Sequence, residues 1–305
     1  MERINRINKE LKDLFKDRLE DNKIYYELNE DDNDIIKVLM IGIENTPYEN
    51  GFFFFSLRFP ESYPNVPVKM WYYTTHSNIR FNPNLYNNGK ICLSILNTWG
   101  DVDNWNSQMS AKSALLSIQS MVLNNNPLNN EPNLNPCNED IEMYNDILYY
   151  SVFNIAILDV LKFSNTERYL ENNPKNKTIN FNNFKSIIID YYIKNINWYI
   201  NRCKELHYKY FNCVFRFPKP YNYKGIKYAS NFYNVLIDLI NIYKLHSNNE
   251  LGNIEIKIDY INLNKLNLLK LKKICKKNKI KNYSKLKKKD IIELIKLKNE
   301  EFIFI

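Results

Sequence analysis

The sequence predicts an α+β fold in which one helix is followed by antiparallel strands and then by further helices. Apolar residues change from helical to strand-like spacing near residue 24, and they return to helical spacing near residue 110. Elements segregated along the chain in this way are typical of α+β folds, whereas alternating strands and helices indicate a parallel sheet. At about 150 residues per domain, the 305 residues suggest two domains.

The first helix is expected over residues 3–19, where Ile4, Ile7 and Leu11 recur at helical spacing with Lys and Arg between them. From residue 24 to residue 73 the pattern is that of strands. The β-branched and aromatic runs IIKVLMIGI, GFFFFSLRF and VPVKMWYY are separated by turn-forming stretches such as NTPYENG. Three or four antiparallel strands in a meander fit this spacing.

Residues 76–108 are predicted to be irregular, and so long a loop in a compact domain is usually functional. Residues 124–138 are a second loop, rich in Pro and Asn, and residues 209–232 show no assignable pattern. Ser284 is expected to be the N-cap of the last helix. The helices expected after the strands cover residues 110–123, 139–163, 183–208, 232–245, 264–277 and 285–298.

Positive charge is concentrated at the end of the chain. Residues 265–298 hold fourteen Lys against Asp290 and Glu293, a local charge of +12, whereas the whole chain carries +8. The net charge of the rest of the chain is therefore about −4 (8 − 12). A local patch of this size predicts an anionic partner, most simply nucleic acid.

Composition excludes several classes of protein. No run of about 18 apolar residues indicates a membrane-spanning helix, and the charged first residues do not resemble a secretory signal. Five scattered cysteines favour a reducing compartment, so we expect the cytoplasm, the nucleus or a viral replication compartment. Six glycines without a phosphate-loop pattern, and three histidines without CxxC, predict no cofactor and no metal site.

Cys92 is the candidate nucleophile. It lies in the segment FNPNLYNNGKICLSILNTW at residues 81–99, directly after a turn-forming stretch. The alternative is that this cysteine is a small buried apolar residue, as most single cysteines are. No histidine lies near it in the sequence, so a Cys–His pair of the protease type has no local support.

This segment resembles the active site of ubiquitin-conjugating enzymes, in which a His-Pro-Asn tripeptide precedes the catalytic cysteine at a fixed interval. Here Asn82-Pro83-Asn84 takes the place of the tripeptide, and Cys92 follows at the family spacing. Three further family marks stand in the expected order: RINKELKDL at 6–14, the strand-and-turn stretch at 46–70, and Trp105 with SALLSIQSMV at 113–122. The resemblance implies a UBC-type fold, a four-stranded antiparallel meander between N-terminal and C-terminal helices.

Within this family, the resemblance is strongest to the conjugating module of the very large hybrid conjugating-enzyme/ligase proteins of the BRUCE (apollon) type. It rests on NPNLYN, GK, CLSILNTW and Asn130-Glu131-Pro132. The resemblance implies that Cys92 accepts ubiquitin as a thioester from the activating enzyme and passes it to lysines of protein substrates. The alternatives are a catalytically inactive scaffold of the same fold and a nucleic-acid-binding protein.

The resemblance also assigns roles to further residues. Asn84 matches the asparagine that donates to the oxyanion or braces the loop, and Asn129 lies where many members place an Asp or Ser over the cysteine; the adjacent Asn130 and Glu131 are alternatives. Arg6 and Lys9 match positions used to bind the activating enzyme. For Asn84 the alternative is a role in the turn alone, and for Arg6 and Lys9 it is a solvated helix face.

The sequence departs from the family pattern at two places. Asn82 replaces the family histidine, a change that the BRUCE-like members share. Asn65 and residues 106–108 (Asn-Ser-Gln) stand where many members dock ligases through a Phe and a Pro-Ala pair. The resemblance therefore implies direct selection of substrates more than the use of ordinary RING or HECT ligases.

The tail at 262–298 resembles a SAP-type or Rho-N-type helix–loop–helix module. The resemblance implies binding of DNA or RNA, although a solvated Lys-rich helical hairpin is the alternative. We expect three domains: a conjugating domain at 1–165, a helical extension at 166–260 and the basic module at 261–305. The lysines expected to contact phosphates are Lys272, Lys273, Lys276, Lys277, Lys287, Lys288 and Lys289.

Overall fold

A computed structural model of the chain is organised as two compact units, one around Met1–Tyr199 with Asn212–Ser230 and one around Ile200–Phe211 with Asn231–Ile305. The expected domain boundaries after residues 165 and 260 stay a prediction. The residues that the structure describes are 2–17, 19–30, 32–76, 79–99, 104–162, 167–168, 179–210, 232–247, 267–277 and 283–297.

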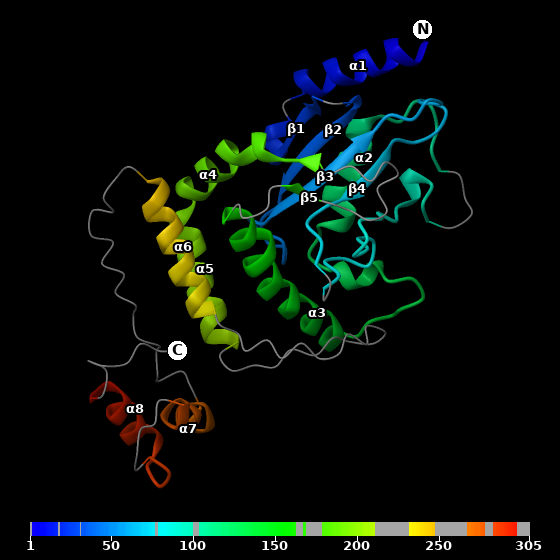
Figure 1. Ribbon diagram of the computed structural model, residues 1–305. Coiled ribbons are helices and arrows are strands. Elements are labelled where there is room, and N and C mark those ends of the chain that lie inside the picture. Colours follow the sequence, from blue (N-terminus) through cyan, green and yellow to red (C-terminus); the bar gives the residue numbers. More distant parts are fainter. Residues whose placement is uncertain are drawn as a thin grey trace. The chain divides into compact units, whose positions relative to one another are not determined.

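The first unit contains a four-stranded antiparallel sheet with the strand order β1-β2-β3-β4. Helix α1 (Glu2–Lys16) precedes the sheet, as the amphipathic spacing predicts, and Figure 1 shows the strands side by side in blue to cyan. The predicted α+β meander is therefore confirmed. The strands are β1 (Ile24–Asn29), β2 (Asp32–Ile41), β3 (Phe52–Arg58) and β4 (Lys69–Tyr72).

Both faces of the sheet are buried around β3. Phe53 and Phe55 point to one face, where Phe53 contacts the ring of Phe81 from the active-site segment at 5.9 Å between centroids. Phe52 and Phe54 point to the opposite face and are equally buried. The run of four phenylalanines thus lies in a strand that is buried on both sides. Such a strand does not need to alternate apolar and polar residues.

Residues 179–199 cover this second face. The ring of Phe181 lies 4.7 Å from that of Phe54, and Tyr191 contacts Phe52 at 6.2 Å between centroids. The side chain of Asn50, in the turn before β3, accepts a hydrogen bond from the Tyr191 hydroxyl at 2.7 Å. This segment is therefore part of the same packed unit as the sheet.

The expected helix at 183–208 is two helices. The backbone N–H of Asn195 donates to the carbonyls of Tyr191 and Tyr192, which ends the first helix and leaves a break before the second. The extension also contains short strands. These elements are β5 (Glu167–Arg168), β6 (Ile179–Asn180), the 3-10 helix η6 (Asn182–Phe184), α4 (Lys185–Lys194) and α5 (Ile196–Tyr210).

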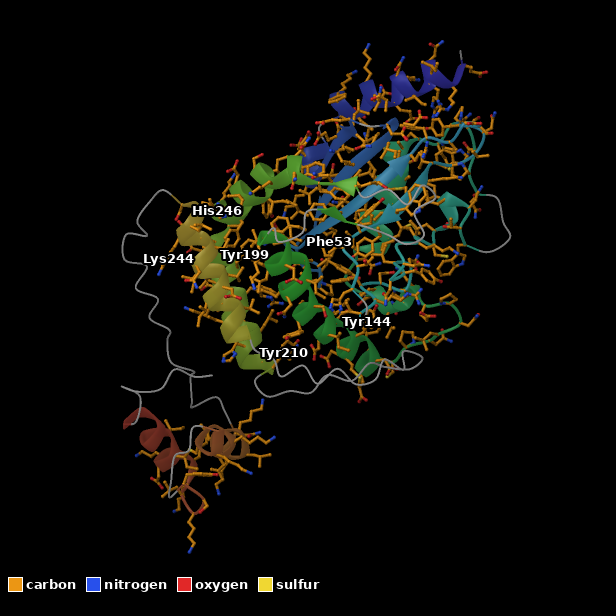
Figure 2. All side chains as sticks on the ribbon, viewed as in Figure 1. Phe53, Tyr144, Tyr199, Tyr210, Lys244 and His246 are labelled. Carbon is orange, nitrogen blue, oxygen red and sulfur yellow. The ribbon has the colours of Figure 1, made fainter. Side chains whose placement is uncertain are left out.

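Helix α2 begins where two side chains bind its free backbone N–H groups. Ser110 accepts from the N–H of Ser113, and the buried carboxylate of Glu10 accepts from the N–H of Ala111 at 3.0 Å. Figure 2 labels Phe53 on β3 and Tyr144 on the helix α3, both of them buried. The helical segments here are η1 (Leu19–Asn22), η2 (Ser94–Leu96), α2 (Ala111–Ser117), η3 (Ile118–Val122), η4 (Pro127–Asn130), α3 (Asn138–Ser151) and η5 (Val152–Asp159).

The described part of the second unit is helical beyond residue 200, with α6 (Phe232–His246), α7 (Leu268–Lys277) and α8 (Lys288–Leu297). Helices α7 and α8 pack together. Helix α8 begins at Lys288, so the expectation that Ser284 caps it is wrong, and the carbonyl of Ser284 accepts from Lys272 Nζ instead. Within the described ranges, no helix has the length and apolar character that a membrane span needs.

Candidate active site

The active-site segment is a folded loop that pairs with the edge of the sheet. Lys90 forms a β-bridge with Trp71 of β4, and Ile91 forms another with Leu85. The turn between them closes on Tyr86, whose N–H donates to the carbonyl of Lys90 at 2.9 Å. Gly89 adopts a φ of 84°, a left-handed conformation that favours glycine. Residues 79–92 of the predicted irregular segment therefore follow a defined backbone path to Cys92.

Cys92 lies next to Asn84 and is partly exposed. Its backbone N–H donates to the Asn84 carbonyl at 2.9 Å, and its Sγ donates to the Thr98 carbonyl at 2.8 Å. Burial raises the pKa of the Cys92 thiol, while the positive charges of Lys90 and Arg80 act to lower this pKa. The resting thiol is thus protonated at neutral pH and reachable from solvent.

Asn82, which replaces the family histidine, is fully buried and joins three segments of chain. Its Oδ1 accepts from the N–H of Asn84 at 2.7 Å and from Asn130 Nδ2 at 3.3 Å. Its Nδ2 donates to the carbonyl of Val122 at 2.8 Å. An amide is able to do this because it carries acceptor and donor groups together. Asn82 therefore fixes the tripeptide against the end of the helix that follows Cys92.

Asn84 is only 5% exposed, and its Oδ1 is buried without a hydrogen-bond partner. An unsatisfied buried polar atom costs about 1–3 kcal/mol, and such a cost calls for an explanation. The rest of Asn84 is held firmly, since its N–H binds Asn82 and its carbonyl binds the N–H of Cys92. The side-chain oxygen of Asn84 is thus left unpartnered, and the role of this residue at the reacting bond stays a prediction.

The loop after η3 supplies Asn130, rather than Asn129, to the hydrogen-bond network of the site. Asn130 Nδ2 donates to Asn82 Oδ1 and to the carbonyl of Met121 at 2.7 Å. Asn129 is exposed, and its backbone N–H closes the 3-10 turn on Asn126. Glu131 is partly exposed next to them. The roles of Asn129 and Glu131 at the reacting bond stay predictions.

Arg6 and Lys9 differ in their surroundings. Arg6 donates to the buried Glu10 at 2.8 Å and to the carbonyl of Met109 at 2.7 Å. Glu10 in turn accepts from the Tyr63 hydroxyl at 2.6 Å, so Arg6 belongs to a network that joins α1 to the start of α2. Lys9 is exposed on α1. Their expected part in binding the activating enzyme stays a prediction.

Arg80 and Tyr86 are site residues that the sequence interpretation missed. The Arg80 guanidinium lies 3.8 Å from the centre of the Tyr86 ring, and it also donates to the carbonyl of Pro83. Lys90 Nζ lies 5.7 Å from the same ring. The sequence signal for this contact was a cationic residue before the Asn-Pro-Asn tripeptide and an aromatic residue after it. The stack holds two positive charges near the sulfur.

Thr98 and Asn97 are further residues that the interpretation missed. The Thr98 hydroxyl accepts from the N–H of Leu93 at 2.8 Å, which fixes the carbonyl that the Cys92 thiol binds. Asn97 Oδ1 accepts from the N–H groups of Asn104 and Trp105. Trp105, expected from the family pattern, is 6% exposed and donates to the carbonyl of Pro64 at 2.7 Å.

The tail lysines that were predicted to bind phosphate lie on α7, on α8 and just before α8. Five of those predicted to bind phosphate are exposed: Lys273, Lys276, Lys287, Lys288 and Lys289. Lys272 is partly buried and donates to the carbonyl of Ser284 at 2.6 Å, and the Lys277 side chain lies outside the described residues. Among the side chains that the structure describes, no group of three or more His, Cys, Asp or Glu is placed to hold a metal ion.

Comparison with known proteins matches residues 6–149 to the family model described as "Ubiquitin-conjugating enzyme". This match covers just under half of the 305-residue chain, which is similar to that family over these residues. The chain is 43% identical over 150 residues to the probable ubiquitin-conjugating enzyme protein 17 of Caenorhabditis elegans, covering 46% of this chain and 21% of that protein. It is 41% identical over 137 residues to ubiquitin-conjugating enzyme E2 Z of Danio rerio, covering 43% of this chain and 41% of that protein.

A third relative is the human dual E2 ubiquitin-conjugating enzyme/E3 ubiquitin-protein ligase BIRC6. It is 47% identical over 114 residues, which cover 36% of this chain and 2% of that protein. The chain thus spans less than half of the length of each of these relatives. Relatives with and without a ligase in their names are similar to the chain at comparable identity, so the hybrid subclass stays a prediction.

Proposed function

We propose that the chain is a ubiquitin-conjugating enzyme that carries ubiquitin as a thioester on Cys92 and transfers it to lysines of protein substrates. The observation that carries this proposal is the position of Cys92. Its thiol is partly exposed, and its backbone N–H donates to the Asn84 carbonyl. The activating enzyme and ubiquitin are the partners that this reaction requires. The cytoplasm or the nucleus is the compartment that we propose.

The first step forms a bond between Cys92 Sγ and the ubiquitin carboxyl carbon, and it breaks the bond from that carbon to the sulfur of the activating enzyme. The thiol proton passes to the departing sulfur. Because one thioester replaces another, the exchange is close to balanced in energy. A free cysteine with an ordinary pKa of about 8.5 is a few per cent thiolate at neutral pH, and burial raises the pKa of Cys92 above that value. Lys90 and Arg80 oppose this shift. Because a thiolate is a strong nucleophile and the exchange is nearly balanced in energy, we propose that the step proceeds without a histidine.

In the second step the amine nitrogen of a substrate lysine attacks the thioester carbon, the new C–N bond forms, and the Cys92 sulfur leaves. The carbonyl oxygen passes through an anion, which needs a donor already in position. The amide of Asn84 is the candidate donor, since the rest of the residue is fixed by Asn82 and Cys92. The hydrogen-bond network around Asn82 supports the position of Asn84.

The amine must also lose a proton, and its ordinary pKa is about 10.4. Asn129 and Asn130 are able to orient an amine but do not accept its proton at neutral pH. The proton then has to leave with the departing Cys92 sulfur or through solvent. We assign two contributions to the site: it orients the attacking amine, and it removes water from the thioester.

The direct test is to incubate the full chain with ubiquitin, the activating enzyme and ATP, and to separate the products without reductant. We expect an adduct that reductant removes and that Cys92→Ala abolishes. Asn84→Ala is expected to retain the adduct and to slow its discharge onto free lysine. Failure to form an adduct with any ubiquitin-like protein would reject the proposal.

We also propose that the lysine-rich helices α7 and α8, a SAP-like or Rho-N-like module, tether the enzyme to nucleic acid. The observation that favours this second function is the set of five exposed lysines on and next to these helices. Deletion of residues 262–305 is expected to weaken binding to duplex DNA and to single-stranded RNA while thioester formation continues. Unchanged affinity for both after this deletion would refute the tether.

A further inference from the structure

The Cys92 thiol is held by a main-chain carbonyl. Its Sγ donates to the carbonyl oxygen of Thr98 at 2.8 Å, and Thr98 is exposed. Because only a protonated sulfur donates in this way, the bond belongs to the resting thiol and is lost once an acyl group replaces the proton. The oxygen then lies beside the thioester without its donor from Cys92, where a group that attacks the thioester carbon comes close to it.

Thr98 is clasped to Leu93, the residue that follows Cys92. The N–H of Leu93 donates to Thr98 Oγ1 at 2.8 Å, and this hydroxyl donates to the Leu93 carbonyl at 3.1 Å. The N–H of Thr98 donates to the same carbonyl at 3.2 Å. Leu93 is buried, so the clasp is anchored in packed side chains. The Thr98 carbonyl is therefore an acceptor whose direction is fixed in advance, and the hydroxyl contributes two of the bonds that fix it.

The turn that brings Thr98 back to the sulfur is also well defined. Asn97 has a φ of 52°, a left-handed conformation that asparagine adopts more readily than most residues do. Its Oδ1 accepts from the N–H groups of Asn104 and Trp105 at 3.0 Å and 3.1 Å. The reversal at Asn97 thus lets a residue six positions after Cys92 face the Cys92 sulfur.

The charges beside the sulfur favour an amine that arrives neutral. Burial raises the pKa of the Cys92 thiol, whereas Lys90 and Arg80, both cations, act to lower it. The same two cations disfavour the protonated form of an amine placed at the thioester. A neutral amine attacks with its lone pair and keeps two N–H groups, for which a carbonyl oxygen is a suitable acceptor.

We propose that the Thr98 carbonyl, which loses its Cys92 donor when the thiol is acylated, accepts a hydrogen bond from the attacking amine, and that the Thr98 hydroxyl positions this carbonyl. The inference rests on the proposed function and deepens it, because it names an acceptor that favours amines over thiols. As the C–N bond forms, the nitrogen becomes positively charged, so this hydrogen bond strengthens in the transition state.

The remaining steps return the site to its resting state. The C–S bond breaks, the electron pair of that bond leaves with the sulfur, and the proton that the nitrogen gives up passes to the Cys92 thiolate. The carbonyl does not take this proton, but it holds the N–H close to the sulfur that does. The new S–H then donates to the Thr98 carbonyl again, as in the resting thiol.

The experiment compares two acceptors of the same ubiquitin thioester on the full chain. Free lysine attacks with an amine that has N–H groups to donate, whereas mercaptoethanol attacks as a thiolate that has none. The measured quantity is the rate of discharge onto lysine divided by the rate onto mercaptoethanol. A general change in the reactivity of the thioester cancels in this ratio, because both acceptors attack the same carbon.

Thr98→Val removes the hydroxyl, and it should lower this ratio by about threefold to tenfold, the range of one hydrogen bond. Thr98→Ser keeps a hydroxyl and should keep the ratio. Thr46→Val is the matched control, because Thr46 Oγ1 donates to the Ile43 carbonyl at 2.8 Å and accepts from the N–H of Tyr48 in another turn. It should leave the ratio unchanged. An equal fall in the two valine variants would overturn the inference.

A second variant serves if Thr98→Val does not fold. An ester in place of the peptide bond between Thr98 and Trp99, introduced with the α-hydroxy analogue of Trp99, keeps both side chains and makes the Thr98 carbonyl a weaker acceptor. The ratio should fall for this ester as well. A ratio that stays the same in the ester and in Thr98→Val would refute the role of the carbonyl while the proposed function stands.

The inference is also tested without ubiquitin. A small acetyl thioester transfers its acetyl group to the cysteines of the chain, and site-resolved mass spectrometry follows its loss from Cys92 to lysine and to mercaptoethanol. The exposed Cys137 is the internal control. A ratio that depends on Thr98 at Cys92 but not at Cys137 supports the inference even if no ubiquitin thioester forms, in which case only the proposed function fails. Equal ratios in the native chain and in Thr98→Val at Cys92 would overturn it.

Discussion

In the active-site segment, the buried side chain of Asn82 binds Asn84, Val122 and Asn130, whereas on and next to helices α7 and α8 most of the predicted binding residues are exposed lysines. Cys92 is held by its backbone N–H on the Asn84 carbonyl and by its Sγ on the Thr98 carbonyl, and we propose that this region acts through fixed positions. The second region has a small core of Leu271, Cys275, Ile291 and Ile292, and we propose that it acts through charge.

This difference has a consequence for mutation. Where function depends on position, a neutral substitution is costly because it leaves buried partners unsatisfied. Where function depends on the density of charge, single substitutions are mild and roughly equal, because each lysine contributes one contact to a phosphate. The two regions should therefore respond differently to chemically matched substitutions.

The largest effect is expected from removal of apolar packing in the sheet that pairs with the active-site segment, compared with removal on α7. Phe54→Ala deletes a ring that is 3% exposed and contacts Phe181, and it should lower the free energy of unfolding by about 3–5 kcal/mol. Leu269→Ala on α7 changes a residue that is 65% exposed and should cost less than about 0.5 kcal/mol. Chemical denaturation of the full chain measures both. Similar losses for the two variants would break the comparison.

The next effect is on the hydrogen bonds of Asn82. Asn82→Ala leaves the N–H of Asn84 and the carbonyl of Val122 without their partner, and it should destabilise the chain by about 1–3 kcal/mol. It should also slow discharge of the thioester. Asn65→Ala, at an exposed asparagine, is the matched control and should change stability by less than about 0.5 kcal/mol. An unaltered discharge rate in the Asn82 variant would contradict the positioning role.

A smaller effect is expected at the thiol. Because burial raises the pKa of Cys92, its alkylation by iodoacetamide should keep accelerating with pH above the ordinary cysteine range. Lys90→Gln removes a charge that lowers this pKa, so alkylation at neutral pH should slow by about twofold to fivefold. The exposed Cys137 serves as an internal control in site-resolved mass spectrometry. Equal slowing at both cysteines would argue against a local electrostatic cause.

The smallest effect is expected from one lysine of the tail. Lys273→Gln should reduce the slope of log affinity against log salt for duplex DNA by about 0.9, one phosphate contact. Lys194→Gln, an exposed lysine of the first unit, should leave that slope unchanged. A loss from Lys273→Gln that does not depend on salt would indicate a contact of fixed geometry, and the contrast between the regions would then disappear.

Much of the first unit could be predicted because its signals are local or lie in one motif. Helical spacing located α1, and the aromatic runs located the strands in their order. The motif around Cys92 indicated a resemblance to ubiquitin-conjugating enzymes, and residues 6–149 match that family model. The break at Asn195 was missed, since the apolar spacing continues through it and only the backbone bonds to Tyr191 and Tyr192 show the end of α4.

The contacts between distant residues could not be predicted. The stack of Arg80 on Tyr86 and the bond from Cys92 to the Thr98 carbonyl depend on how the loop closes. The choice of Asn130 over Asn129 depends on the 3-10 turn at Pro127–Asn130, because the turn determines which side chain faces Asn82. Neither spacing nor composition contains this information.

The sequence by itself singled out Cys92 as the candidate nucleophile, since its spacing from Asn84 is a property of covalent order. It also determined where the positive charge lies. Only the tertiary structure decided that Asn82 joins three segments and that residues 179–199 cover the sheet. The physical reason is that burial and hydrogen bonding are satisfied by groups brought together from distant parts of the chain.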